Sequence, residues 1–252
     1  MIVFSDIDNT ILAPKEDKIA EQRFKDFIYE RRLRGDFKLV YATGRNTHEY
    51  EQVSPRLPVP DMLVTAVGTE IWGISDDGLC FLRIPWDISS DLCFDKQVIE
   101  TEALSLGFLE QQKKSEQKYQ CGFLATPTTN AETLRVRLLD KTQDVNVIQS
   151  GNNVDVIPCT MGKGEAIKWV LASLAPDYSF PILTIGDSEN DISMLTYPGA
   201  FSWCPCNAHI KIKNLPGILI APFECSEGVM YAIENVSHDY AKIIDRVGVR
   251  KE

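Results

Sequence analysis

"IVFSDIDNTIL" (residues 2–12) is the stretch that decides the fold, because its apolar start predicts a buried strand that ends at two acids, Asp6 and Asp8. An unpaired buried charge is costly, so these acids require partners elsewhere in the chain. Polar groups follow two further expected strands, in "TGR" (43–45) and "GDSEND" (186–191). Ligands of open parallel sheets bind beyond the carboxyl ends of the strands, so the three clusters are expected to meet in one site.

The apolar pattern around these clusters alternates between strands and helices. The first part of the chain predicts strands over 1–8, 37–45 and 61–73, with helices over 18–35 and 49–57 between them. This β-α-β-α-β order is typical of a parallel sheet. The same rhythm returns with a helix over 162–174 and a strand that leads into "GDSEND".

The middle of the chain interrupts this rhythm. Short strand-like pieces surround two expected helices at about 93–106 and 130–141. We therefore expect a split α/β core, residues 1–75 and 159–252, with an α+β insert over residues 76–158.

Composition excludes several classes of function. The chain has 252 residues and a net charge of −10, which argues against binding to a nucleic-acid backbone. No apolar run reaches the length of a membrane-spanning helix, and the first residues do not resemble a secretory signal. The seven cysteines are odd in number and irregularly spaced, which indicates reduced thiols and a cytoplasmic protein. "CPCNAH" (204–209) lacks a second ligand pair and is predicted to be a loop, with His48 and His238 at the surface.

The converging acids need a counter-charge. Without one they would repel each other and their pKa values would rise. Mg²⁺ prefers such oxygen ligands, and Asp6 and Asp187, with the main-chain carbonyl of Asp8, are the natural direct ligands. Lys163 is expected to neutralise the remaining charge and to contact a phosphate, which would also receive the hydroxyl group of Thr43.

The two neighbouring acids, Asp6 and Asp8, suggest two different catalytic roles. A carboxylate beside a phosphoryl group can act as a nucleophile and form an aspartyl-phosphate. The other acid is then free to protonate the leaving oxygen and to deprotonate the attacking water. Each motif is common alone, and the acids can also serve only as helix caps, in which case no Mg²⁺ dependence is expected.

Four motifs together resemble the haloacid dehalogenase superfamily of aspartate-nucleophile phosphatases. They are "DIDNT" (6–10), "TGR" (43–45), "GKGEA" (162–166) and "GDSEND" (186–191). The insert resembles the cap of its class IIB members, and the nearest likeness is to the sucrose-phosphate phosphatase branch. Three further segments resemble that branch: "VTAVGTEIW" (64–72), "IQSGNNVDVIPCTMGKGEAI" (148–167) and "CSEGVMYAI" (225–233). The resemblance implies a Rossmann-like parallel-sheet core with an inserted α+β cap domain.

The resemblance also implies a role for each matching residue. It makes Asp6 the nucleophile, Asp8 the acid/base and Mg²⁺ the cofactor, with sucrose-6-phosphate as the leading substrate. The residues it assigns to the metal are Asp6, Asp8, Asp187, Asp191 and Ser188, with Asp191 acting through water. Those it assigns to phosphate or substrate are Thr43, Gly44, Arg45, Lys163, Asn190, Glu70 and, in the cap, Lys118. Arg45 and Glu70 are expected near the mouth of the site, Ser188 and Asn190 beside Lys163 or the phosphate, and Asn207 in the loop after a core strand.

Other functions remain open from the sequence. The same class includes phosphatases of mannosylglycerate, glucosylglycerate, amino-sugar and hexose phosphates, and "QKYQCGFLA" (117–125) only partly resembles the cap strand of enzymes that use sucrose phosphate. A sugar phosphomutase on the same core and a non-catalytic sugar-phosphate binding protein are further alternatives. The expected partner is a small sugar phosphate, and the expected state is a monomer or a weak homo-oligomer.

Overall fold

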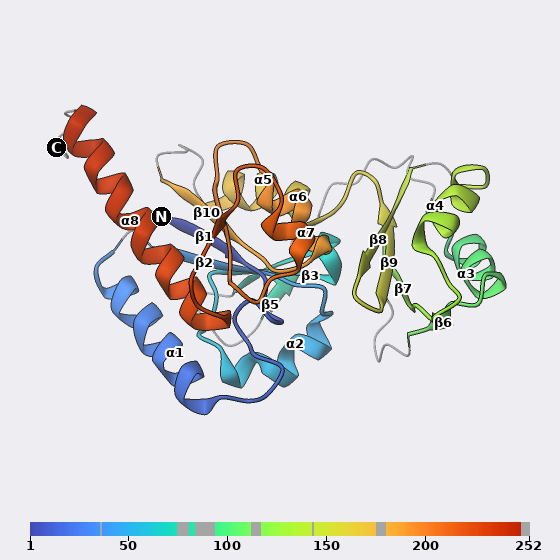
Figure 1. Ribbon diagram of the computed structural model, residues 1–252, viewed down its shortest axis with the longest axis horizontal. Helices are drawn as coiled ribbons and strands as arrows, with labels where there is room; N and C mark the ends of the chain where they lie inside the picture. The colour runs from blue at the N-terminus through green and yellow to red at the C-terminus, as the bar shows by residue number, and fades with distance from the viewer. Residues whose placement is uncertain are drawn as a thin grey trace.

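The computed structural model describes residues 1–35, 37–74, 81–83, 94–111, 117–142, 144–174 and 180–247, with the side chains of 74, 81–83 and 237–247 excepted. Within these residues the strands form two separate sheets, one of eight strands and one of four. Figure 1 shows the larger sheet with its helices beside the N-terminus and the smaller sheet at the other end of the molecule.

The larger sheet has the order β12-β11-β10-β1-β2-β3-β4-β5. Its strands are β1 (Ile2–Ser5), β2 (Lys38–Ala42), β3 (Met62–Thr65), β4 (Glu70–Ile74), β5 (Phe81–Arg83), β10 (Ile182–Ile185), β11 (Phe201–Cys204) and β12 (Leu219–Ile220). The strands from β12 to β3 are all parallel, whereas β4 and β5 are antiparallel to their neighbours. The central strands β10, β1 and β2 are adjacent, so their carboxyl ends lie at one edge.

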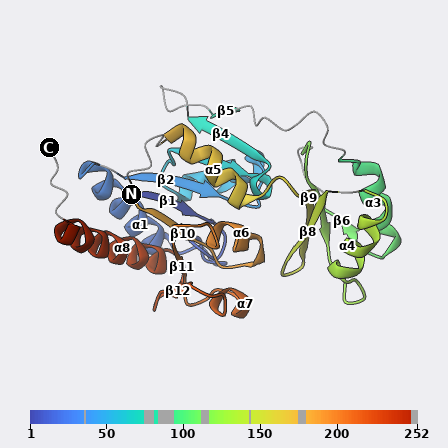
Figure 2. The same ribbon diagram turned by 90° about the horizontal axis from the view of Figure 1, so that it is seen from above.

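Helices cover both faces of this sheet (Figure 2). The longer ones are α1 (Lys18–Leu33) and α8 (Cys225–Val247) on one face and α5 (Lys163–Leu174) on the other. The shorter ones are α2 (Thr47–Val53), α6 (Ile192–Leu195) and α7 (Ile210–Lys213), with 3₁₀ turns over Ser54–Arg56, Ala66–Gly68 and Glu189–Asp191.

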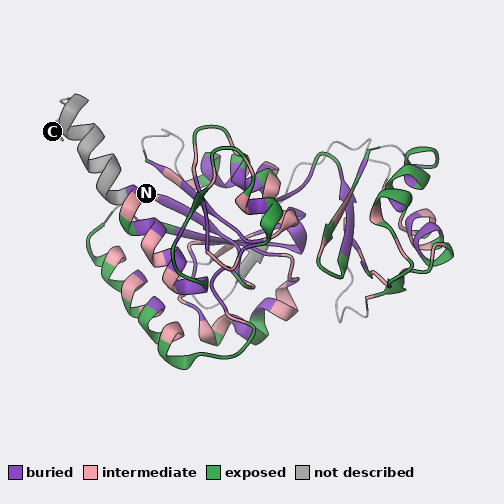
Figure 3. Ribbon diagram, in the orientation of Figure 1, coloured by how far each residue is buried: buried purple, intermediate pink, exposed green. Residues whose placement is uncertain are grey.

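Strand alternation explains the two layers of core. Along β2, Leu39 and Tyr41 pack with α1 and α8, while Val40 and Ala42 pack with α5. Strands that are buried on both faces are expected for parallel sheets covered by helices. Figure 3 shows the central strands as the most continuously buried part of this sheet.

The smaller sheet has the order β6-β7-β9-β8 and is antiparallel. It consists of β6 (Leu109–Glu110), β7 (Cys121–Leu124), β8 (Val145–Ser150) and β9 (Asn153–Pro158). The helices α3 (Lys96–Ser105) and α4 (Ala131–Leu139) pack on the face that is turned away from the larger sheet (Figure 1). Val154 and Val156 of β9 point to these helices, so Asp155 between them lies on the face toward the core.

Two details of the predicted organisation are wrong. The single strand expected over residues 61–73 is two antiparallel strands, β3 and β4, because the chain reverses at Ala66–Gly68 with positive φ angles. The expected boundary at residue 76 is also too early, since β5 pairs with β4 in the larger sheet. The strand 81–83 therefore belongs to the core, and Asp76 itself lies outside the described residues.

Among the described residues, no helix has the length and apolar character needed to cross a membrane. Their cysteines are free thiols, namely Cys121, Cys159, Cys204, Cys206 and Cys225, while Cys80 and Cys93 lie outside the described residues. His48 is partly exposed, and the side chain of His238 is not described.

Candidate active site

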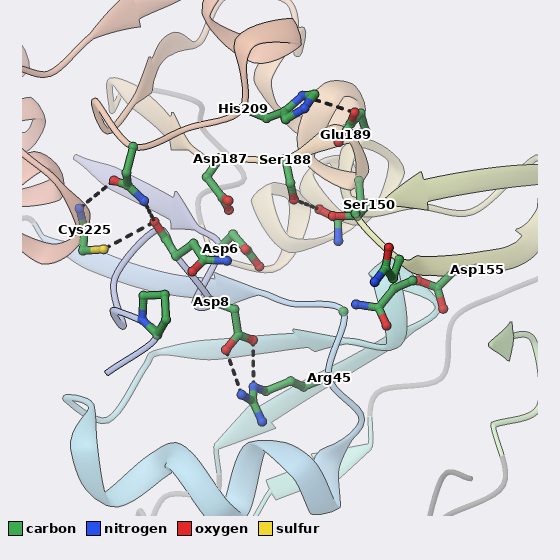
Figure 4. Close-up of a pocket in the computed structure, with 18 of the residues that line it drawn as sticks. Asp6, Asp8, Arg45, Ser150, Asp155, Asp187, Ser188, Glu189, His209 and Cys225 are labelled. Atoms are coloured by element: carbon green, nitrogen blue, oxygen red, sulfur yellow. Dashed lines mark hydrogen bonds and ion pairs between the residues drawn. The ribbon is translucent and has the colours of Figure 1, made fainter. Parts of the chain in front are cut away.

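The candidate site lies where three adjacent parallel strands end. Asp6 follows β1, Thr43 follows β2 and Asp187 comes shortly after β10. The register pairs Ser5 with both Ile185 and Tyr41, so the residues that follow these strands are neighbours in space. Figure 4 shows Asp6, Asp8 and Asp187 directed into the same cleft.

Lys163 is the cation buried beneath these acids. Its side chain is completely buried, and its ammonium group binds Oδ1 of Asp6 at 2.8 Å and Oδ1 of Asp191 at 2.7 Å. Burial lowers the pKa of Lys163, but Asp191 and Asp6 raise that pKa by more, so the ammonium group stays charged. Burial raises the pKa of Asp6 well above its usual value, and Lys163 only partly opposes this. One lysine therefore does not suffice to keep all the nearby acids ionised together.

The carboxylates of Asp6, Asp187 and Asp191 can hold a metal ion. Each offers an oxygen within 4.8 Å of the others, and the three side chains are buried. Thr10 donates to Oδ1 of Asp187 at 2.9 Å, which orients that carboxylate. The oxygens of Asp191 are already engaged, because Oδ1 binds Lys163 and Oδ2 accepts from the backbone N–H groups of Asp187 and Ser188. Asp191 is therefore better placed to support a metal than to ligate it directly.

A glycine makes the position of Asp191 possible. A Cβ atom at Gly186 would lie 2.5 Å from Cβ and Cγ of Asp191. Because real Cβ atoms do not approach this closely, residue 186 must lack a side chain for Asp191 to bind the backbone of Asp187 and Ser188. This close contact explains why the first residue of "GDSEND" is a glycine.

The metal-free protein is expected to lose stability as pH rises. Burial, with a contribution from Asp191, raises the pKa of Asp187 to about 7, from 3.8 in an unfolded chain. The folded state then binds the proton more tightly, so this stabilisation is complete below about pH 4 and is lost as pH approaches 7. We expect the free energy of unfolding to fall by on the order of 3 kcal/mol over this range, measured by urea titration in a chelator. Asp187→Asn should flatten the slope, and an equal slope in that variant would contradict the assignment.

Asp8 is held by a different partner. Arg45 binds it with two parallel hydrogen bonds, Nε to Oδ2 and Nη2 to Oδ1, both 2.7 Å long (Figure 4). The pair is partly exposed and lines the cleft. The Asp8 side chain is thus engaged by Arg45, which is compatible with the prediction that Asp8 meets the metal through its main-chain carbonyl.

The other residues of the phosphate motifs lie beside this cluster. Thr43 is buried, and its Oγ1 accepts from the backbone N–H of Arg45 at 3.1 Å. Oδ1 of Asn190 accepts from Ser188 at 3.0 Å and from Lys163 at 3.4 Å. This is the position expected for Asn190, next to the lysine. The hydroxyl group of Ser188 donates to Asn190, and Ser188 lines the cleft.

Gly44 also has its place in the lining of the cleft. A Cβ atom there would lie 3.5 Å from Nδ2 of Asn190, an ordinary contact. The strand end after β2 and the segment after β10 thus approach each other across the site.

Two predicted substrate residues lie elsewhere. Glu70 is 8% exposed at the start of β4, accepts from Thr65 at 3.1 Å, and is not in the lining of the cleft. Lys118 is exposed before β7, with its ammonium group 4.9 Å from the ring centroid of Tyr119. Neither residue is among the described residues that line the cleft, so the substrate roles expected for Glu70 and Lys118 stay predictions.

The cap contributes residues that the sequence analysis missed. The cleft has a volume of about 870 Å³ and lies between the core site and the cap. Six of the described cap residues line the cleft. They are Ser150, Gly151, Asn152 and Asn153 at the β8–β9 turn, together with Asp155 and Gln111. Gln111 donates to Asn153 at 2.6 Å and Gln120 donates to Asp155 at 2.7 Å. The polar "SGNN" turn between two apolar strands was the available signal for this wall.

The remaining rim of the cleft has structural contacts of its own. Asn207 donates to the backbone carbonyl of Asn9 at 2.7 Å and accepts from the backbone N–H of Cys225 at 3.0 Å. It joins the loop after β11 to the loop after β1 and to the start of α8. His209, from the "CPCNAH" loop, lies 3.3 Å from Glu189 (Figure 4). Burial raises the pKa of the Cys225 thiol to about 11, so this thiol is poorly suited to nucleophilic chemistry.

The fold and site define a haloacid dehalogenase-type core with a cap. A solved sucrose-phosphatase from Synechocystis sp. PCC6803, in complex with sucrose and phosphate, superposes with a TM-score of 0.76 at 23% identity, covering 94% of this chain and 97% of the other. A solved subclass IIB sugar phosphatase of the same superfamily superposes with a TM-score of 0.64 at 13% identity, covering 94% and 98%. The predicted Rossmann-like core with an inserted cap is thus confirmed.

The chain belongs to the sucrose-6F-phosphate phosphohydrolase family, whose model matches residues 1–236. Sucrose-phosphatase 2 of Nicotiana tabacum is 27% identical over 255 residues, which is 92% of this chain. The chain spans only 58% of the length of that relative. The resemblance predicted from the four motifs is therefore confirmed at the level of the family.

Proposed function

We propose that this protein is a Mg²⁺-dependent phosphatase of a small sugar phosphate, with sucrose-6-phosphate as the leading candidate. The observation that carries the proposal is the buried Lys163, bonded to Asp6 and Asp191 below a polar cleft. Burial of an ammonium group between carboxylates has a desolvation cost, so stability alone is a weak reason for its presence. Here the group lies where a phosphate would meet Asp6. Membership of the family supports the same reaction.

Asp6 is proposed to attack the phosphorus atom and Asp8 to carry the protons. The new bond joins a carboxylate oxygen of Asp6 to phosphorus, while the bond from phosphorus to the sugar oxygen breaks. Asp8 gives its proton to that leaving oxygen. It then accepts a proton from the water that attacks the aspartyl-phosphate, which releases phosphate and restores both acids. Arg45 holds both oxygens of Asp8 before substrate binds, so it must release one of them for Asp8 to carry a proton.

The donor set fits Mg²⁺. Asp6 and Asp187 offer carboxylate oxygens, Asp191 supports them from behind, and the carbonyl group of Asp8 is the expected third protein ligand. When bound, Mg²⁺ would neutralise charge on the transferring phosphoryl group. The residues of the chain then orient the phosphate through Lys163, Thr43 and Asn190.

The cleft favours an uncharged polyhydroxyl group beyond the phosphate. Its lining is rich in amides and carboxylates, and Arg45, its one arginine or lysine in the described residues, is already paired with Asp8. Amides and carboxylates suit sugar hydroxyl groups, whereas a second anionic group would find repulsion from Asp155, Glu189 and Glu224. This argument supports a neutral glycoside phosphate over substrates with a carboxylate.

A panel of phosphates with Mg²⁺, assayed for phosphate release, tests the proposal. We expect sucrose-6-phosphate to have the highest kcat/KM, and glycosylglycerate phosphates and 2-phosphoglycolate to be poorer by about 10-fold or more, since each carries an additional carboxylate. A flat profile would identify a generalist sugar phosphatase. Isomer formation without phosphate release would identify a phosphomutase, and phosphate binding without turnover would leave a binding protein.

We propose a cytoplasmic location and a monomeric or weakly associating state. The free thiols of the described cysteines are typical of a reducing compartment. We further propose that the first part of the core extends through β5, and that the cap lies between β5 and about residue 158.

A further inference from the structure

The turn between β3 and β4 has an unusual backbone. Ala66, Val67 and Gly68 have φ angles of 51°, 57° and 93°, so three consecutive residues are left-handed. Such a conformation is unfavourable for alanine and is an outlier for a β-branched residue such as valine. All three are buried. Strain of this kind persists where the surrounding structure requires it, and it is concentrated at functional sites.

One side of this turn is bound to the phosphate motif after β2. The backbone N–H of Ala66 donates to the carbonyl of Arg45 at 2.8 Å, and that of Val67 donates to the carbonyl of Thr43 at 3.1 Å. The turn is therefore fixed relative to Thr43, whose hydroxyl group is expected to bind phosphate.

The other side of the turn touches the backbone that carries Lys163. A Cβ atom at Gly68 would lie 2.2 Å from the carbonyl carbon of Gly162 and 2.4 Å from the backbone nitrogen of Lys163. Only a glycine permits this approach.

The first turn of α5 is also close to the backbone of α6. A Cβ atom at Gly164 would lie 2.4 Å from the carbonyl oxygen of Ser193, and the backbone N–H of Gly164 donates to Oγ of Ser193 at 3.1 Å. The start of α5 is thus held between the Ala66–Gly68 turn and Ser193.

We propose that the Ala66–Gly68 turn is a positioning element that sets how far the ammonium group of Lys163 reaches toward Asp6 and the phosphate. The turn fixes one distance, between the phosphate motif after β2 and the first turn of α5. Gly68 is accordingly a positioning residue that acts through Lys163. This inference rests on the proposed function, because it assumes that Lys163 contacts a phosphate.

Gly68→Ala tests the proposal, with Gly35→Ala as the matched control. Gly35 has a φ of 79°, and a Cβ atom there would have no other atom within 4 Å, so its replacement adds backbone strain without a collision. We expect Gly68→Ala to lower kcat about 100-fold and to weaken binding of inorganic phosphate in Mg²⁺ buffer, as displacement of a catalytic group by about 1 Å does. Gly35→Ala should keep kcat within about twofold. Equal kcat in folded Gly68→Ala and wild type would overturn the proposal.

Two further variants separate positioning from stability. Ser193→Ala removes the hydroxyl group that accepts from Gly164 and should fold. We expect a fall in kcat of about 5-fold with a melting temperature lowered by only about 2–4 °C, and an unchanged kcat would count against the proposal even if Gly68→Ala fails to fold. In a Lys163→Gln background, Gly68→Ala should change residual turnover less than twofold, because its effect passes through Lys163. A full second 100-fold loss would overturn the proposal.

The failure of the proposed function is distinguishable from the failure of this inference. If the wild type hydrolyses no sugar phosphate, the proposed function fails, and calorimetry with inorganic phosphate and Mg²⁺ still measures whether Gly68→Ala weakens the phosphate site. If the wild type is active and the affinity for phosphate is equal in both proteins, only the positioning role fails.

Discussion

Asp6→Asn is expected to lower kcat by about 10⁴-fold or more, because the amide cannot attack phosphorus and no other carboxylate of the cluster replaces it. Asp187 is engaged by Thr10, and Asp191 by Lys163 and two backbone N–H groups. Burial raises the pKa of Asp6 well above its usual value, so ionisation of Asp6 opposes folding of the metal-free protein. The free energy of unfolding of Asp6→Asn should therefore fall less steeply with rising pH than that of the wild type.

Steady-state kinetics and urea unfolding in a chelator measure these two effects. Asp17→Asn is the matched control: Asp17 is exposed and caps α1 by accepting from Ile19 and Ala20, and asparagine is an equally good cap. That variant should keep full kcat. If Asp6→Asn retained more than about one hundredth of wild-type kcat, Asp6 would not be the nucleophile.

Removal of Mg²⁺ is the second change with a large expected effect. With three buried carboxylates around one lysine, the metal-free cluster carries excess negative charge, and a phosphate would meet repulsion there. We expect dialysis against a chelator to remove more than about 99% of turnover, and millimolar Mg²⁺ to restore it. Because Mg²⁺ binds only the folded cluster, saturation at about 100 times its dissociation constant should add about 2.7 kcal/mol to the free energy of unfolding.

Phosphate release and thermal unfolding are measured in parallel, with NaCl at matched ionic strength as the control for screening. Asp187→Asn should lose both the activity and the stabilisation by Mg²⁺. Full turnover in the chelator would refute a metal-dependent mechanism and would favour the alternative in which these acids only cap helices. A stabilisation that is equal in NaCl and in Mg²⁺ would show that bulk screening, and not a site, is responsible.

The sequence predicted the core of the site because its signals are local. Short, nearly continuous apolar runs in β1, β2 and β10 mark buried strands, and each strand is followed closely by polar residues. Asp6, Thr43 and Asp187 could therefore be assigned to one sheet edge by the general rule for parallel sheets. The four motifs together then indicated the family, which the match over residues 1–236 shows.

The turn at Ala66–Gly68 had no comparable signal. "AVG" is compatible with an extended strand, and alanine and valine rarely adopt positive φ angles, so local propensity predicted one strand where the structure has two. The same reversal of the chain puts Glu70 at the start of β4, bonded to Thr65, a contact that no local pattern predicted.

The sequence by itself determined the fold class, the order of the elements and the acids and lysine of the site, because periodicity and residue type act over a few neighbouring positions. Only the tertiary structure decided their partners: Lys163 with Asp6, 157 positions away, Arg45 with Asp8, and the β8–β9 turn of the cap across the cleft. Such contacts depend on how distant elements pack, and close approaches such as that of Gly68 to Lys163 arise from that packing and leave no pattern in the local sequence.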